Sequence, residues 1–202
     1  MEYTRFRITE LSVGWMFWQV RGPGIKEDIA ASWIGYPTLD PMLRLATIML
    51  TFRKEGYYWP WGEDEWDDYV VGFDGEPECY KATFYKPEGE VVDFMLEFSE
   101  DDFFDKTPYK VIARGKVNMM QFADDLIEDA AALLRDNGFV GFHENWKEYE
   151  YPIAEFLRLL AVRKGREPYR EGFAQEIKEL IEVIGVNNLP QGITPPEEGI
   201  SQ

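Results

Sequence analysis

The stretch "CYKATFYKPEGEVVDFMLEF" (Cys79–Phe98) decides the fold. Apolar residues occupy every second position on each side of its centre, namely Tyr80, Ala82 and Phe84, then Val92, Phe94, Leu96 and Phe98. A period of two is typical of strands that bury one face. Pro87 and Gly89 supply turn residues between the two arms. The stretch therefore predicts a β-hairpin within an antiparallel sheet.

Further strands are expected on both sides of this hairpin. Near the N-terminus, Thr4, Phe6 and Ile8 alternate with polar residues, and "VGWMFWQV" (13–20) is apolar on both faces, as a central strand would be. "RGPG" (21–24) predicts the turn that ends this extended region. Two more segments have strand character, "DYVVGFDG" (68–75) and "YKVIARGKV" (109–117).

Two segments before residue 140 have the features of helices. In residues 38–56, Asp40 fits an N-cap, Pro41 the first helical position and Gly56 the end, although a buried strand also fits this nearly all-apolar segment. From Asn118 to Gly138, apolar residues recur at helical spacing.

The last third of the chain predicts two more helices, one that begins at Pro152 and one that ends at Gly185. Strands gathered early and helices gathered late indicate the α+β class. We expect an antiparallel sheet from the N-terminal two-thirds, packed against C-terminal helices. We also expect one domain over residues 1–186 and a loosely ordered tail at 187–202, which is rich in proline and glycine.

The composition limits the class of protein. The chain has 202 residues and one cysteine, Cys79, which rules out an internal disulfide framework and a zinc site built on cysteines. No apolar run approaches the roughly 20 residues of a membrane helix. The N-terminus lacks the apolar stretch of a secretory signal. We therefore expect a cytoplasmic protein that does not contact a membrane.

The negative charge is concentrated in the middle of the chain. The net charge is −17; Met1–Lys54 has 7 basic and 5 acidic side chains, Glu55–Glu155 has 8 and 26, and Phe156–Gln202 has 6 and 7. Nucleic acids are bound mainly by neutralising phosphates with Lys and Arg. A chain with this charge is therefore not expected to bind nucleic acid.

No motif in the chain indicates a particular catalytic activity. His143, the only histidine, lies beside Glu144, but no nucleophile signature accompanies this pair. The carboxylates of "GEDEWDD" (62–68) lack the alternating spacing of a calcium loop. A glycosidase needs two carboxylates, but no pair can be selected among the 38 acidic residues. The sequence favours a non-enzymatic protein, and we assign no catalytic residue, metal or cofactor.

The helix predicted from Met119 carries like charges four residues apart. Asp124 precedes Glu128, and Asp125 precedes Asp129, in this way. Each such pair destabilises an isolated helix by about 0.2–0.5 kcal/mol. We interpret these acids as a solvent-exposed face that keeps the protein soluble.

Three segments place aromatic residues among carboxylates: "YYWPWGEDEWDD" (57–68), "EFSEDDFFD" (97–105) and "HENWKEYEYPIAE" (143–155). Aromatic rings are common energetic anchors in interfaces, and clustered charge attracts an oppositely charged partner. The combination suits a basic protein surface. An alternative that fits equally well is that the rings belong to the core and the acids merely flank them.

A strongly acidic α+β chain of this size without catalytic motifs resembles the immunity proteins of bacterial polymorphic-toxin systems. The segments "EDEWDD" (63–68), "EFSEDDFFD" (97–105) and "ADDLIED" (123–129) carry the resemblance. It implies a protein that binds and blocks a cognate toxin, often a basic nuclease, frequently through an acidic surface.

We therefore predict an acidic binding protein that neutralises or regulates a basic protein partner, such as a toxin. The predicted partner-binding residues are Trp59, Trp61, Glu63, Asp64, Glu65, Trp66, Asp67 and Asp68, followed by Asp101, Asp102, Phe103 and Asp105. The alternative is a small-ligand or carbohydrate-binding protein, or a hydrolase, that uses residues 57–68. The oligomeric state does not follow from the sequence.

Overall fold

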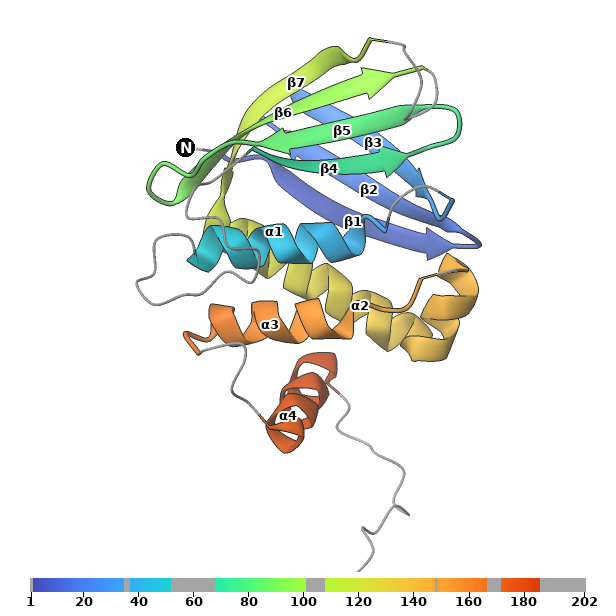
Figure 1. Cartoon of the computed structure of the whole chain (residues 1–202), viewed down its shortest axis with the longest axis vertical. Helices are drawn as coiled ribbons and strands as arrows, with labels where there is room; N and C mark the ends of the chain where they lie inside the picture. Colours follow the sequence, from blue (N-terminus) through green and yellow to red (C-terminus); the bar gives the residue numbers. More distant parts are fainter. Residues whose placement is uncertain are drawn as a thin grey trace, which may run out of the picture.

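The computed structural model describes residues 2–34, 37–51, 68–100, 108–147, 149–166 and 172–185 of the chain. Within these ranges the strands form two antiparallel sheets, and the helices gather at one end of them (Figure 1). The predicted α+β class is confirmed, although the strands divide between two sheets. No described helix is both long and apolar enough to cross a membrane. The predicted tail at 187–202 lies outside the described residues.

The first sheet has the strand order β1-β2-β3, with β1 at Arg5–Ser12, β2 at Trp15–Gly22 and β3 at Ile25–Ser32. The central position of β2 agrees with its apolar character on both faces. The turn predicted at 21–24 connects β2 to β3. The sequence does not predict β3 itself, because the adjacent charged residues Lys26, Glu27 and Asp28 obscure the alternation.

The second sheet has the order β4-β5-β6-β7, with β4 at Tyr69–Asp74, β5 at Cys79–Phe84, β6 at Val91–Ser99 and β7 at Lys110–Asn118. The predicted hairpin is formed by β5 and β6. Its register places Ala82 opposite Leu96 and Phe84 opposite Phe94. The apolar sets of the two arms therefore share one face of the sheet, as the period of two requires.

Aromatic rings fill the space between the two sheets. The ring of Phe6 on β1 lies 5.5 Å from that of Phe84 and 5.1 Å from that of Phe94. Trp18 on β2 contacts Phe73 on β4 at 5.6 Å. These tilted and edge-on arrangements are favoured between aromatic rings. The inner faces of the two sheets thus share one core.

The predicted helices are present: α1 at Leu39–Thr51, α2 at Met119–Trp146, α3 at Ile153–Arg163 and α4 at Phe173–Ile184. The alternative of a buried strand for residues 38–56 is excluded. Asn118 caps α2, since its Oδ1 accepts a hydrogen bond of 3.1 Å from the Gln121 amide. At Gly138, α2 bends instead of ending, because this glycine adopts a φ of 66° inside the helix.

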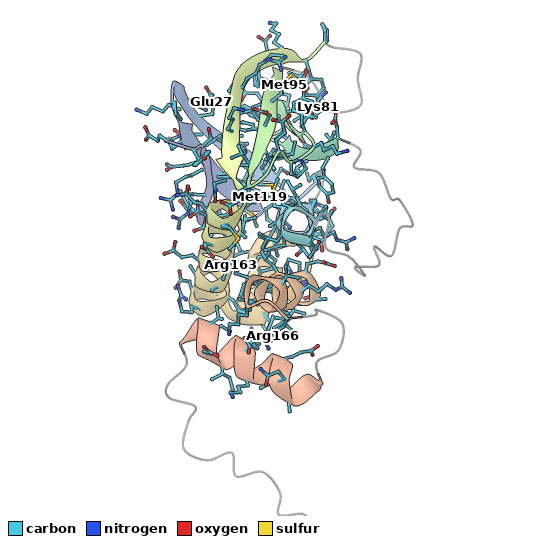
Figure 2. All side chains as sticks on the ribbon, turned by 90° about the vertical axis from the view of Figure 1, so that its left-hand side faces the viewer. Glu27, Lys81, Met95, Met119, Arg163 and Arg166 are labelled. Carbon is cyan, nitrogen blue, oxygen red and sulfur yellow. The ribbon has the colours of Figure 1, made fainter. Side chains whose placement is uncertain are left out.

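The helices are stacked below the strands (Figures 1 and 2). α2 packs against β1, α1 lies against α2 and α3, and α4 packs on α2 and α3. Phe122, in the first turn of α2, lies 6.0 Å from Phe6 and extends the core downward. The far end of α2 reaches the turn between β1 and β2, which is the region of interest for function.

Candidate partner-binding surface

The predicted partner-binding residues fall mostly outside the described part of the chain. This holds for Trp59, Trp61, Glu63, Asp64, Glu65, Trp66, Asp67, Asp101, Asp102, Phe103 and Asp105. Asp68 is described; it is exposed and directly precedes β4. The assignment of these residues to a partner therefore stays a prediction.

The third aromatic and acidic segment, residues 143–155, is described except for position 148 and supports the alternative interpretation. Trp146 and Tyr151 are buried in the core, and the Tyr151 hydroxyl donates a hydrogen bond of 3.0 Å to the Ala130 carbonyl. Burial raises the pKa of Tyr151 well above its usual range. Glu144 and Glu150 are exposed beside these rings. In this segment Trp146 and Tyr151 belong to the core, while Glu144 and Glu150 face solvent.

The interpretation of the α2 acids as a solvent-exposed face is wrong for two of them. Asp125 and Asp129 are only 4% and 5% exposed, because they point toward β1. Arg5 Nε donates to Asp125 at 2.8 Å, and Arg7 Nε lies 3.0 Å from both carboxylate oxygens of Asp129. The arginines of β1 neutralise these two aspartates, although they lie about one hundred and twenty positions away in the sequence.

Asp129 also forms a hydrogen bond with the backbone of β1. Its Oδ2 accepts a hydrogen bond of 2.7 Å from the Ile8 amide. Burial raises the pKa of Asp129, while the hydrogen bonds from Arg7 and Ile8 act in the opposite direction. The hydrogen bond to Asp129 and the charges of the nearby carboxylates raise the pKa of Arg7. The pair therefore fastens α2 to the edge of the first sheet and is structural.

Other acids also pair with cations of the chain. Arg163 on α3 reaches Asp124 on α2 at 2.6 Å, Lys81 reaches Glu97 at 2.9 Å and Lys116 reaches Asp93 at 3.1 Å. In contrast, Glu10, Asp136 and Glu144 are exposed and have no hydrogen bond or ion pair within the described residues. Such free carboxylates give the surface its negative field.

Exposed apolar side chains concentrate at one end of the molecule. Nine large apolar side chains are exposed in the described part of the chain. Four of these nine are Val13, Ile34, Phe139 and Val140, which are 70%, 59%, 45% and 72% exposed. We call these four residues the Val13 surface. They come from the β1–β2 turn, the segment after β3 and the last turns of α2, which meet at the right of Figure 1.

Asn145 joins the parts of the Val13 surface. Its backbone carbonyl accepts a hydrogen bond of 2.5 Å from the Gly14 amide, and its Oδ1 accepts one of 3.4 Å from the Val13 amide. Its Nδ2 donates to the Gly141 carbonyl at 2.9 Å and to Asn137 Oδ1 at 3.2 Å. One side chain therefore bonds to the turn and to both sides of the bend in α2.

The segment after β3 is fixed to the same turn. The Trp33 amide donates to the Gly14 carbonyl at 3.0 Å. A Cβ atom on Gly14 would lie 2.5 Å from Trp33 Cδ1, so only glycine fits beneath this ring. Ile34, next to Trp33, is thereby held close to the turn.

Val13 has an unfavourable backbone conformation. The turn has two residues, with φ values of 35° at Val13 and 86° at Gly14. Such turns favour Asn-Gly or Asp-Gly, and a β-branched residue with positive φ is a clear outlier. Strain of this kind costs on the order of 1–3 kcal/mol. Because the Val13 side chain is also mostly exposed, burial in the core does not compensate for this strain.

Three carboxylates lie on or next to the segments that carry the Val13 surface. Glu76 bonds to the Ser32 hydroxyl, which accepts a hydrogen bond of 3.1 Å from the Ile34 amide. Asp136 and Glu144 adjoin the two asparagines that flank the bend in α2. Lys147 is a cation of the same stretch, and His143 Nδ1 lies 3.1 Å from Glu150. We call the four apolar side chains the apolar centre, and Glu76, Asp136 and Glu144 the acidic rim.

The sequence does not predict the Val13 surface, although it contains two signals for it. One is the glycine that follows Val13 within an alternating stretch, and the other is "GFVGF" (138–142), which places apolar residues between helix-weakening glycines. Neither signal shows that the two segments meet.

The described residues contain no group of three or more His, Cys, Asp or Glu side chains that is placed to hold a metal ion. Exposed apolar side chains and carboxylates, such as those at this end of the molecule, are groups that protein interfaces commonly use. Comparisons with protein-family models, curated proteins and solved structures found no match to this chain.

Proposed function

We propose that the protein is a non-enzymatic binding protein that neutralises or regulates a basic protein partner through the Val13 surface. One observation carries the proposal. Val13 is strained and 70% exposed, so the folded chain alone gains little from a valine at this position. A contact with a partner would bury the side chain and account for its presence.

The apolar centre could supply most of the binding energy of such a contact. Full burial of one Val, Ile or Phe side chain contributes about 1.5–3 kcal/mol. Binding energy in protein interfaces is commonly concentrated in a few central side chains that are shielded from water. Val13, Ile34, Phe139 and Val140 have the size and position for this role. Their support by Asn145 reduces the ordering needed on binding.

The acidic rim indicates the charge of the partner. Glu76, Asp136 and Glu144 would meet Lys and Arg side chains, and the net charge of −17 would attract a cationic protein over a longer distance. A partner with an apolar patch inside a basic surface fits both features. The resemblance to immunity proteins agrees with a partner of this kind.

The predicted carboxylates of the 57–68 segment belong to the same proposal as steering charges, and its three tryptophans as anchors. Reversing the charges of Asp64, Glu65, Asp67 and Asp68 should lower the affinity for the partner and weaken its dependence on salt. If the affinity and its salt dependence both stayed unchanged, the assignment of this segment to the partner would be wrong. The role of the Val13 surface would not be affected by that result, because it has a separate test.

The test of the Val13 surface is a capture experiment on extracts of the source cells at low and moderate salt. The bait proteins are the wild type, Val140→Lys and Val70→Lys, and the captured proteins are identified by mass spectrometry. Val70 is a matched control, because it is a valine that is 49% exposed and lies on β4 in the other sheet.

We expect the wild type and Val70→Lys to retain one basic protein that is released as the salt concentration rises. Val140→Lys should retain at least tenfold less of it, because a cation would face a cationic partner. Equal capture by all three baits, or capture of no basic protein, would contradict the proposal. The latter result would favour the alternative of a small-ligand or carbohydrate-binding protein.

A further inference from the structure

A pocket of about 550 Å³ lies at the opposite end of β2 from the Val13 surface. It is an open hollow, lined by the residues before β1, the start of β1, the turn between β2 and β3, and the first turn of α2. Pockets of 300–1,000 Å³ are the usual size for small organic ligands. Tyr3 and Ile25 give the wall an aromatic and an aliphatic part.

The wall of this pocket is rich in cations, in contrast to the chain as a whole. Arg5, Arg21 and Lys26 line it together with a single acid, Glu2. Two of the cations are held in place: Arg5 by Asp125, and Arg21 by Asp28 and by the Val20 carbonyl. These carboxylates neutralise the two guanidinium groups but leave them facing the pocket.

Lys26 supplies the charge that is not neutralised. It is exposed and has no hydrogen bond or ion pair within the described residues. The positive end of α2 adds to it, because Gln121 lines the pocket and the first turn of α2 contains no acidic residue. Anions are stabilised at such a helix end.

A buried polar group at the pocket wall has no partner. Thr4 is only 3% exposed, and its Oγ1 makes no hydrogen bond within the described residues. It lies directly behind Gly22, a residue of the wall, since a Cβ on Gly22 would come within 2.3 Å of this oxygen. Thr4 therefore lies behind the wall and does not itself line the pocket, which leaves Lys26, Arg5 and Arg21 as the cationic groups that a ligand would meet.

We propose that this pocket binds a small organic anion, with its phosphate or carboxylate group at Lys26 and the start of α2 and its apolar part against Tyr3 and Ile25. The negative charge of the whole protein opposes such a ligand, which sets the dissociation constant on the order of 1 mM. The site is separate from the Val13 surface, and neither proposal depends on the other.

The test is a titration followed by amide NMR at constant ionic strength, with inorganic phosphate, phenyl phosphate and benzoate as probes. The proteins are the wild type, Lys26→Ala and Lys178→Ala. Lys178 is the matched control, because it is an exposed lysine on α4, at the other end of the molecule. Both lysines are free of structural contacts, so both variants should fold.

We expect saturable shifts of the Gly22, Lys26 and Gln121 amides. Phenyl phosphate should bind several-fold more tightly than inorganic phosphate, and Lys26→Ala should weaken binding at least fivefold while Lys178→Ala leaves it unchanged. A stronger response to phenyl phosphate than to benzoate would assign a phosphate ligand, and the reverse a carboxylate. Shifts that do not saturate, or that are equal in Lys26→Ala, would overturn the proposal.

Discussion

At the scale of single residues, the two buried aspartates of α2 show how strongly burial changes the contribution of a charged side chain to stability. Asp129 accepts hydrogen bonds from Arg7 and from the Ile8 amide, whereas Glu128 reaches the same arginine from a position that is 65% exposed. Removing one member of a buried pair costs about 3–5 kcal/mol, while an exposed ion pair contributes about 0–1 kcal/mol.

We therefore expect Asp129→Ala to lower the free energy of unfolding by about 3 kcal/mol and Glu128→Ala by less than about 0.5 kcal/mol. Urea denaturation of the two variants measures both values. Similar losses for the two variants would show that the contact between α2 and β1 does not depend on the buried carboxylate.

At Val13, in contrast, we expect a substitution to increase the stability of the fold. Asn is favoured before glycine in a two-residue turn, so Val13→Asn should raise the free energy of unfolding by about 1 kcal/mol. The same change removes an exposed apolar side chain from the Val13 surface and should weaken capture of the partner. Thermal unfolding and capture can be measured on one preparation. A variant that is less stable than the wild type would refute the strain at Val13.

At the scale of secondary structure, α4 is fixed by a charged contact as well as by apolar packing. Lys164 donates to Glu179, Arg166 Nη2 lies 2.9 Å from it and Gln175 Nε2 donates to it at 2.7 Å. Burial of Glu179 opposes its ionisation, but the bonds and charges of Lys164 and Arg166 outweigh this and lower its pKa.

A carboxyl group with a lowered pKa in the folded state stabilises the fold above its ordinary pKa of 4.5, and this contribution is lost as the pH falls through the lowered value. Glu179→Gln should therefore increase hydrogen exchange in α4 at pH 7, and the difference from the wild type should shrink below pH 4.5. Glu176→Gln, on the same helix, is the control. A difference that is independent of pH would contradict this role of Glu179.

The secondary structure follows closely from local patterns. The hairpin of β5 and β6, the Asn118 cap and the glycine end of α4 all depend on residues that are neighbours in the sequence. The strand β3 cannot be predicted locally, because three charged residues interrupt its alternation. The spacing predicts a helix only as far as Gly138, because a single glycine does not show whether the helix resumes after it.

At the scale of the whole molecule, the candidate site could not be predicted, because it depends on contacts between distant segments. The sequence shows that Asp125 and Asp129 are acidic, but their burial requires the arginines of β1. In the same way, Asn145 brings Val13 beside the end of α2 only in the folded chain. The charge excess is visible in the sequence, while the apolar surface within it is visible only in the structure.

The most direct test of the central claim is the salt dependence of the rate constants for binding between the purified protein and the captured basic partner, with Val140→Lys for comparison. We predict that the association rate constant of the wild type falls at least tenfold between about 50 and 300 mM salt, since attraction between opposite charges is screened. Val140→Lys should in addition dissociate at least tenfold faster. An association rate that is independent of salt, together with equal dissociation rates, would contradict the claim that an acidic, apolar-centred surface binds a basic protein.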